Sequence, residues 1–290
     1  MKTALVTGAA GLLGRATVDA LADSGVEVHA LVRGSDQVFR DDVVFHVMDL
    51  AKPIDTAALP AAVDAIFHLA QAREFRDFPA SAPSVFAINV ATTASLLDYA
   101  YRVGSRSFVY ASSGGVYRGQ PGVSLVEDAP LQGPAELGYY LATKLSSESL
   151  VDSYSTQFIT ASLRYFFIYG AGQARSMLIP RLYDRVSNGD PIALQGPDGM
   201  RINPVHASDA AAATIAAADL ASSTTVNIAG PETISLREIG ELFGRDSGRE
   251  PQFERGEGIA TDLVASTARM SVLLRTPTTT LGGALEDIRG

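Results

Sequence analysis

Residues 3–14 read TALVTGAAGLLG, and this stretch indicates how the chain begins to fold. The apolar, β-rich run at residues 3–7 predicts a strand, and glycines follow it directly at positions 8, 11 and 14. An apolar-periodic segment that ends at Ser24 and Gly25 predicts a helix after this turn. Such glycines permit a tight turn and close backbone approach, while the start of the helix offers unpaired N–H groups to a pyrophosphate. Strand, turn and helix together predict a dinucleotide-binding site.

Length and composition describe an ordinary globular protein. The chain has 290 residues, 47% hydrophobic and 19% charged, enough for one long α/β domain or two closely joined ones. Its net charge of -9 provides no basic surface for nucleic acid or an anionic membrane, so neither partner is expected. No apolar run reaches the length of a membrane span, and no signal-peptide pattern precedes the first strand. Because cysteine is absent, disulfides and thiolate metal sites are excluded, and we expect a cytoplasmic protein without a metal.

The segments after the first helix predict strands that would surround the cofactor. Residues 27–32 predict a second strand, and Arg33 follows it where an acidic residue would accept bonds from the adenosine ribose. An arginine there suits a 2′-phosphate and favours NADP, the alternative being a solvated surface arginine. Residues 43–48 predict a third strand, and Asp49 after it would either bond the adenine or cap a turn.

Two polar residues lie in otherwise apolar segments. His68 is inside a predicted buried strand at residues 63–70, and we interpret it as a core histidine rather than a catalyst or ligand. Asn89 lies on the apolar side of a predicted helix at residues 83–102, where a buried amide needs partners. We expect Asn89 either to tie strands together or to position Lys144.

The candidate catalytic residues are Ser113, Tyr140 and Lys144. Residues 107–111 predict a fifth strand, which would deliver Ser113 to the edge where open parallel sheets bind ligands. Tyr140 and Lys144 are four residues apart on a predicted helix at residues 139–154, so they share one face. A free tyrosine titrates near about pH 10, and a neighbouring positive charge would stabilise its phenolate. The three residues therefore predict acid/base chemistry coupled to hydride transfer.

The rest of the chain is patterned less clearly. The glycine- and proline-rich residues 114–138 predict a loop that covers the site, and residues 158–165 predict a sixth strand. Glycines and prolines then punctuate short segments that are typical of substrate-binding elements. Asp209 begins an alanine-rich helix, where capping explains it. Residues 222–244 predict a strand followed by a helix.

Several ordered motifs are present at regular positions along most of the chain. They are TGAAGLLG at 7–14, HLA at 68–70, NVATT at 89–93, SSGGVY at 112–117, Tyr140 with Lys144, LRYFFIYG at 163–170, NPVHASDAA at 203–211 and VNIAGPETISLREI at 226–239. Together they resemble the extended short-chain dehydrogenases/reductases, also called the NAD-dependent epimerase/dehydratase family. The resemblance implies an α/β fold, a Rossmann-like doubly wound parallel sheet with a smaller C-terminal substrate domain, usually for a nucleotide-diphosphate sugar.

The resemblance also implies a division of the chain and an assembly. The dinucleotide-binding domain would take residues 1–165, with residues 203–228 returning to it. The substrate domain would take residues 166–202 and 229–290. A homodimer is expected to pack through the helices predicted at residues 83–102 and 139–154, because their apolar stripes can serve a core or a partner.

By the same resemblance, Tyr140 is the general acid/base, Lys144 lowers its pKa and bonds the nicotinamide ribose, and Ser113 orients the reacting oxygen. The family's catalytic Ser or Thr maps onto Ser113 rather than Ser112. NAD(P) would be bound by Gly8, Gly11, Leu12, Leu13, Gly14, Arg33, Asp49, Leu50, Leu69, Ala70, Gln71, Asn89, Ala111, Tyr140 and Lys144. The substrate would be bound by Ser113, Gly114, Phe167 and Arg201.

Three departures from the family pattern bear on the substrate. Members that act on nucleotide sugars often have asparagine at the position of Phe167, and the family's phosphate-binding arginine usually lies next to the position of Arg201. The 4,6-dehydratases carry an Asp-Glu pair after the catalytic residue, whereas Gly114 and Gly115 follow Ser113 here. Without those carboxylates, removal of water is disfavoured.

Three hypotheses for the function follow. The first is an NAD(P)-dependent oxidoreductase/isomerase that removes hydride from a sugar carbinol of a nucleotide-diphosphate sugar and returns it, as an epimerase does. The second is an NADPH-dependent carbonyl reductase on a non-sugar substrate, which Arg33 and the apolar Phe167 favour. The third is a cofactor-sensing protein without catalysis, which the intact Ser113, Tyr140 and Lys144 argue against.

Overall fold

The centre of the protein is a parallel sheet of seven strands. The computed structural model describes residues 1–289. Neighbouring strands pair in parallel throughout this sheet, as expected of a doubly wound α/β fold, which is thereby confirmed. In spatial order the strands are β10 (Thr224–Ile228), β7 (Ile159–Tyr165), β5 (Ser107–Ser113), β4 (Ala65–His68), β1 (Thr3–Thr7), β2 (Glu27–Val32) and β3 (Val44–Val47).

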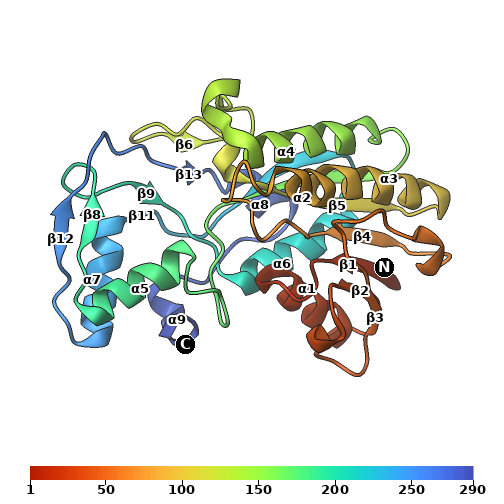
Figure 1. The fold of residues 1–290 in the computed structure, drawn as a ribbon, viewed down its shortest axis with the longest axis horizontal. Helices are drawn as coiled ribbons and strands as arrows, with labels where there is room; N and C mark the ends of the chain where they lie inside the picture. Colours follow the sequence, from red (N-terminus) through yellow and green to blue (C-terminus); the bar gives the residue numbers. More distant parts are fainter. Residues whose placement is uncertain (290) are drawn as a thin grey trace.

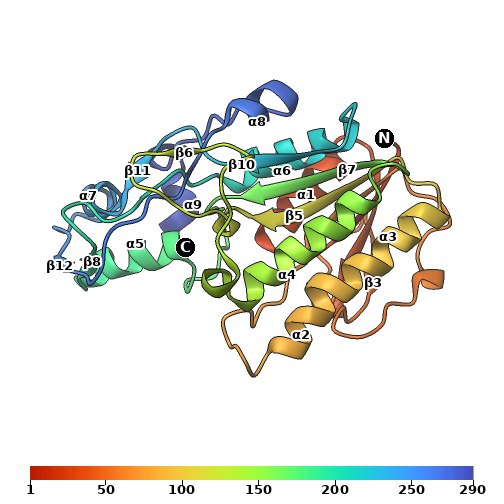
Figure 2. The same cartoon turned by 90° about the horizontal axis from the view of Figure 1, so that it is seen from above.

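Helices cover both faces of this sheet, as Figure 2 shows. One face carries α1 (Leu12–Asp23) and α6 (Ala207–Ala216), which pack against each other although almost 200 residues separate them along the chain. The other face carries α2 (Ala82–Phe86), η3 (Ala87–Ala91), α3 (Thr92–Arg102) and α4 (Pro134–Ser153). Strands buried on both sides are apolar along their whole length rather than alternating, which explains runs such as ALV in β1.

A second lobe has a core of its own, at the left of Figure 1. Its helices are α5 (Leu178–Asn188), α7 (Leu236–Ser247) and the short α9 (Glu286–Arg289). A capping box begins α7, because Ser235 accepts from the Glu238 N–H while Glu238 accepts from the Ser235 N–H. Two small sheets complete the lobe, β8 (Ile192–Leu194) with β12 (Phe253–Arg255) and β9 (Arg201–Ile202) with β11 (Ile234–Ser235).

The remaining elements are short connections. They are β6 (Ser124–Leu125), which pairs with β13 (Val264–Ala265), the helix α8 (Ala268–Leu273), and the 3₁₀ turns η1 (Ser35–Gln37), η2 (Thr56–Ala58), η4 (Gly114–Val116), η5 (Ala217–Asp219) and η6 (Gly282–Ala284). Among residues 1–289, none of the helices is long and apolar enough to cross a membrane.

The helices around the site are less regular than the sequence predicts. The helix expected at residues 83–102 contains a π-helical turn, η3, where the backbone widens around Asn89. Such turns frequently occur at functional sites. Helix α4 begins at Pro134, but Gly138 has a φ of 69° and a ψ of 165°, which interrupts the helical backbone. The regular helix therefore starts at residue 139, as the sequence predicts.

Asp209 does not cap α6, so that prediction is wrong. His206 is the N-cap residue, and its ring accepts from the Ser208 N–H. The Asp209 carboxylate instead accepts from the N–H groups of Thr278 and Thr279 at 2.8 and 2.7 Å. Asp209 thus fixes the C-terminal segment to the sheet-bound helix, a contact that no local pattern can predict.

We expect Asp209→Ala to lower the free energy of unfolding by about 1–3 kcal/mol, because two backbone donors lose a charged acceptor. Urea unfolding of the whole chain measures the change. Asp219→Ala is the matched control, since the Asp219 side chain is 65% exposed and lies 3.6 Å from Arg106. That variant should stay within about 0.5 kcal/mol of the parent. Equal effects from both variants would contradict the role of Asp209.

Candidate active site

The glycine turn after β1 is a site of very close backbone packing. Gly8 has a φ of +68°, and a Cβ there would lie 2.7 Å from the Ala70 backbone nitrogen. A Cβ on Gly14 would lie 2.0 Å from the Gly8 carbonyl oxygen. The Ala70 N–H also donates to the Thr7 hydroxyl at 3.2 Å. Only glycine fits at positions 8 and 14, so the turn, α1 and the end of β4 meet backbone to backbone.

The N-terminus of α1 is built to receive a negative charge. Gly11 is its N-cap in an extended conformation, and within the described chain no side chain caps it and no acidic residue occupies its first turn. The N–H groups of Leu12, Leu13 and Gly14 have no partner inside the helix because of helix geometry. Together with the glycine cradle, these donors fit the pyrophosphate of a dinucleotide.

The predicted adenosine-side residues lie at the ends of β2 and β3. Arg33 is exposed, and its N–H donates to the Gln37 side chain at 3.0 Å. The Asp49 carboxylate accepts from the Ala51 N–H at 3.1 Å, so in this structure it stabilises a turn. The Leu50 carbonyl accepts from the Thr92 hydroxyl at 3.0 Å.

Strand β5 and helix α4 bring the three predicted catalytic residues to one edge of the sheet. The Lys144 ammonium donates to the Ala111 carbonyl at 2.8 Å and is 1% exposed. The Ser113 hydroxyl accepts from the Gly115 N–H at 3.2 Å. A Cβ on Gly115 would lie 3.3 Å from that hydroxyl and 3.2 Å from the Leu141 side chain, which places Ser113 beside the residue after Tyr140.

The Tyr140 hydroxyl is held as a hydrogen-bond donor. It donates to the Gln71 side-chain oxygen at 2.8 Å, and Leu69 and Ala70 lie buried just before Gln71 at the end of β4. Burial raises the pKa of Tyr140, and the charge of Arg76 opposes this effect. Burial lowers the pKa of Lys144 to about 7, and the Glu148 carboxylate opposes that shift.

These directions differ from the expectation that Lys144 lowers the pKa of Tyr140. The Lys144 nitrogen is turned towards the Ala111 carbonyl and lies 5.9 Å from the centre of the Tyr140 ring. With burial dominating, the phenol in this structure is an acid rather than a phenolate.

The side-chain polar atoms of His68 and Asn89 are all hydrogen-bonded to neighbouring residues. His68 is fully buried between the hydroxyls of Thr7 at 2.7 Å and Thr93 at 3.0 Å, and burial lowers its pKa to about 3. This agrees with a core histidine. The Asn89 side chain accepts from the Ala72 N–H at 3.2 Å and donates to the Thr143 hydroxyl at 2.9 Å. Asn89 therefore connects the end of β4 to the residue that precedes Lys144.

The predicted substrate residues are less closely grouped. A Cβ on Gly114 would lie 2.4 Å from the Phe166 ring, so packing alone requires this glycine. Phe167 has a φ of +47° and contacts apolar residues of both the second lobe and the β6–β13 region. A left-handed backbone at an aromatic residue costs about 1–3 kcal/mol and is typical of functional sites. Arg201 is exposed on β9, and its N–H donates to the Asp262 carboxylate at 2.8 Å.

The structure adds residues that the sequence reading missed. Phe75 lies with its ring 4.5 Å from that of Tyr140, and the Arg76 guanidinium reaches the Met177 sulfur at 4.0 Å. On the other side of Lys144, Glu148 is paired with Arg164. Two features of the sequence point to this pair. Glu148 follows Lys144 at helical spacing, so both lie on one helix face. Arg164 lies in an otherwise apolar strand, where a buried charge needs a partner of opposite charge.

Solved structures resemble this fold closely over nearly its whole length. MoeE5 in complex with UDP-glucuronic acid and NAD is 26% identical, with a TM-score of 0.81 and coverage of 99% of this chain and 98% of that one. A UDP-N-acetylglucosamine 4-epimerase from Methanobrevibacter ruminantium M1 has a TM-score of 0.87 at 20% identity, with coverage of 99% and 97%, a likeness of fold.

Two relatives with assigned names match along the sequence. The probable UDP-glucuronate 4-epimerase of Rhizobium meliloti (strain 1021) is 25% identical over 216 residues, 68% of this chain and 62% of that protein. The chain thus spans about three fifths of the length of this relative. The dTDP-4-dehydro-6-deoxy-D-allose reductase of Streptomyces bikiniensis is 27% identical over 287 residues, 89% of this chain and 85% of that protein.

The broadest match is to a family model. The NAD dependent epimerase/dehydratase family model aligns with residues 4–229, which contain the glycine turn, the end of β5 and the helix that bears Tyr140 and Lys144. With this span of the sequence, and with the glycine cradle and the Ser113, Tyr140 and Lys144 arrangement of the structure, the chain belongs to the NAD dependent epimerase/dehydratase family.

Proposed function

We propose that the protein is an NAD(P)-dependent oxidoreductase/isomerase that removes hydride from a carbinol of a nucleotide-diphosphate sugar and returns it, as an epimerase does. One observation carries the proposal. The Lys144 ammonium is bonded at 2.8 Å to the strand that ends in Ser113, one helical turn after Tyr140, at the same sheet edge as the glycine cradle of α1. The names of the relatives and structural neighbours support the substrate class.

The proposed mechanism assigns one role to each residue. A bound nicotinamide would supply the hydride acceptor, near the buried Lys144. Tyr140 would first lose its own proton to solvent, and its phenolate, released from the bond to Gln71, would then accept the proton of the substrate hydroxyl as hydride leaves. Ser113 would donate to the reacting oxygen and orient it. Lys144 would stabilise the Tyr140 phenolate by its charge, against the burial that raises the pKa of Tyr140 in this structure.

The closing half of the reaction reverses the first. Tyr140 would return the proton to the keto oxygen of the sugar when hydride comes back to the opposite face of the same carbon. The cofactor therefore undergoes no net change, and this distinguishes an epimerase from a reductase. Water elimination is not part of the proposal, because Gly114 and Gly115 follow Ser113 where acid and base would be needed.

Either nicotinamide dinucleotide fits the glycine cradle, and we propose a preference for NADP. Arg33 is exposed directly after β2, where its guanidinium can reach a 2′-phosphate. Its backbone N–H donates to the Gln37 side chain, and its guanidinium is the group that would bind the phosphate.

A second candidate is an NADPH-dependent carbonyl reductase on a non-sugar substrate. The Streptomyces bikiniensis relative, named a dTDP-4-dehydro-6-deoxy-D-allose reductase, aligns with 89% of this chain and supports net reduction, although its name gives a nucleotide sugar as the substrate. The apolar Phe167, at a position that often holds asparagine in relatives acting on nucleotide sugars, also favours this candidate. A non-catalytic cofactor sensor is the least supported reading, since Lys144 is buried at the cost of its solvation and bonded beside Ser113.

We also propose a division into two domains and a homodimer. Residues 1–165 with 203–228 would form the dinucleotide-binding domain, and residues 166–202 with 229–290 the substrate domain. The separate apolar core of α5, α7 and α9 supports this division. The dimer would pack through residues 83–102 and 139–154, and the exposed side chains of Phe86 and Tyr101, 51% and 58% exposed, support it.

The first test is product analysis with UDP-, dTDP- and GDP-sugars, together with NADPH absorbance. We expect an epimer without net change of the cofactor, and any released keto-sugar should be matched by NADPH formed rather than consumed. Tyr140→Phe should lower kcat roughly 100- to 10,000-fold, because the general acid/base is lost. Tyr139→Phe is the matched control, since the Tyr139 hydroxyl donates to the Ala82 carbonyl at 3.1 Å. Stoichiometric NADPH oxidation would favour the reductase, and full activity of Tyr140→Phe would refute the catalytic assignment.

The second test concerns the cofactor. Arg33→Ala should weaken NADPH binding about 10- to 100-fold and leave NADH binding unchanged, because only the 2′-phosphate loses a charged partner. Titration calorimetry with both cofactors measures this, and Arg118→Ala, another exposed arginine, is the control. NADPH affinity that Arg33→Ala leaves intact would rule out the NADP preference assigned to Arg33.

The third test concerns assembly. Sedimentation velocity should give the mass of two chains, and the double variant Phe86→Ser with Tyr101→Ser should sediment as one chain because the proposed interface becomes polar. Val272→Ser alters a side chain that is 83% exposed on α8, outside that interface, and should leave the dimer intact. A parent protein with the mass of one chain is incompatible with the proposal.

A further inference from the structure

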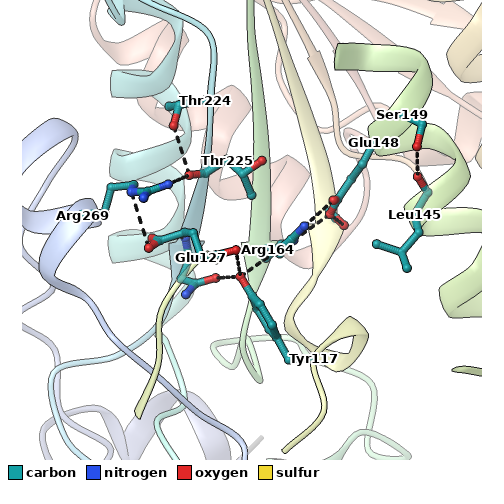
Figure 3. Close-up of polar contacts among 11 residues, drawn as sticks. Tyr117, Glu127, Leu145, Glu148, Ser149, Arg164, Thr224, Thr225 and Arg269 are labelled. Atoms are coloured by element: carbon teal, nitrogen blue, oxygen red, sulfur yellow. Dashed lines mark hydrogen bonds and ion pairs between the residues drawn. The ribbon is translucent and has the colours of Figure 1, made fainter. Parts of the chain in front are cut away.

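Glu148 lies on α4 one turn after Lys144, and its carboxylate is held from two strands (Figure 3). Arg164 of β7 binds it with two parallel hydrogen bonds, from Nε at 2.9 Å and from Nη2 at 2.7 Å. The Ser112 hydroxyl of β5 donates to the same carboxylate. Glu148 and Arg164 are 9% and 7% exposed, so this is a buried charge pair in the bidentate geometry that binds most strongly.

The pair is anchored at its outer end as well. The second terminal nitrogen of Arg164 donates to the Tyr117 hydroxyl at 2.7 Å, and Tyr117 donates to the Asn227 side chain at 2.8 Å. The Asn227 N–H donates to Glu127 at 3.0 Å, and Glu127 lies 3.5 Å from Arg269. Figure 3 shows Glu148, Arg164, Tyr117, Glu127 and Arg269 in a row that runs from α4 across the strands. Arg164 and Ser112 together hold the Glu148 carboxylate beside β7 and β5.

Three consecutive residues of β5 then act on the same helix and site. The Ala111 carbonyl accepts from Lys144, the Ser112 hydroxyl donates to Glu148, and Ser113 presents the candidate catalytic hydroxyl. Lys144 and Glu148 therefore fasten α4 to β5 at two successive helical turns. Any sliding of α4 along the strand, which would separate Tyr140 from Ser113, breaks both bonds.

The charged and titratable groups around Lys144 are few. Tyr140 and Glu148 share its helix, the Tyr110 ring of β5 lies 5.2 Å from its nitrogen, and His68 of β4 is neutral because burial lowers its pKa to about 3. The turn η3 offers the neutral Asn89. The farther groups are Arg164 on β7, Arg76 near Tyr140, and Asp152, one turn beyond Glu148 in a groove that both carboxylates line.

We propose that Glu148 is a positioning residue for Lys144: held by Arg164 and Ser112, its carboxylate keeps Lys144 in the ammonium form and fixes α4 against β5. The catalytic meaning of this arrangement rests on the proposed function, since Lys144 must be charged to stabilise a Tyr140 phenolate. The effect of Glu148 on the charge of Lys144 does not rest on the proposed function, and it is measurable without substrate. Burial works against the ammonium, and Glu148 is the neighbour whose charge opposes burial.

The composition of the chain permits a direct test, because it contains only three lysines, Lys2, Lys52 and Lys144. Selective ¹³Cε-lysine labelling of the full chain gives three signals whose shifts follow ionisation, and Lys2→Arg and Lys52→Arg assign them. We expect Lys144 to titrate near pH 7 in the parent protein. Glu148→Gln should lower that midpoint by about one unit, since an opposite charge is removed.

Arg164→Gln should move the Lys144 midpoint upwards, because it removes a positive charge and frees the carboxylate. Opposite signs for the two variants are what an electrostatic role requires, whereas a general loosening of the core moves both in one direction. Asp152→Asn is the matched control: it removes a carboxylate from the same groove but leaves the Arg164 pair intact, and the Lys144 midpoint should stay unchanged.

Should Glu148→Gln fail to fold, as judged by near-UV circular dichroism, the double variant Glu148→Gln with Arg164→Gln avoids leaving the Arg164 charge buried without its partner. Its Lys144 midpoint should also fall, because the carboxylate is gone. A Lys144 midpoint equal to that of the parent in folded Glu148→Gln or in the double variant overturns the proposal. So does a shift of equal size in Asp152→Asn.

The catalytic part is tested by the pH dependence of kcat. Lys144 is charged below its pKa, so a lower pKa means that activity is lost at a lower pH. We expect Glu148→Gln to move the basic limb of the profile down by the shift seen in the titration, about tenfold less activity at pH 8, with KM unchanged. If the Lys144 midpoint moves in Glu148→Gln but the pH profile of kcat does not, the charge of Lys144 is not required for catalysis. Absence of activity towards every sugar nucleotide rejects the proposed function but leaves the titration result standing.

Discussion

The site depends on the burial of one cation. Lys144 is 1% exposed, and its ammonium has exchanged water for the Ala111 carbonyl and the faces of two tyrosine rings. A buried ammonium is stable only where fixed partners replace its hydration. The Asn89 side chain binds Thr143, the residue before Lys144, and Glu148 one turn after Lys144 supplies an opposite charge, so both flank the buried ammonium.

Much of the fold could be predicted because each strand is determined by residues that are neighbours in the sequence. The strands at residues 3–7 and 27–32 agree residue by residue with β1 and β2, since apolar runs between turn signals define a buried parallel strand. Asp209 shows the limit. An acidic residue at a helix start looks like a cap, but its carboxylate binds Thr278 and Thr279, 69 and 70 residues away along the chain. Contacts of that range depend on how the two lobes pack.

The candidate site could likewise be predicted only in part. The i, i+4 spacing placed Tyr140 and Lys144 on one helix face, and the strand end placed Ser113, whereas the protonation states could not be predicted because they depend on burial. Phe167 is a further case. Its φ of +47° suits asparagine far better than phenylalanine. In this chain, packing against two apolar clusters replaces that backbone preference.

The return of α6 and β10 to the sheet governs how a growing chain can fold. Both elements follow the α5–β9 part of the second lobe in sequence, yet α6 packs beside α1 and β10 forms the edge next to β7. A nascent chain that ends before α6 therefore exposes the apolar side of α1 and an unpaired strand edge. The first lobe cannot close on the ribosome until residue 228 has emerged, so part of the second lobe is synthesised while the first is still open to chaperones.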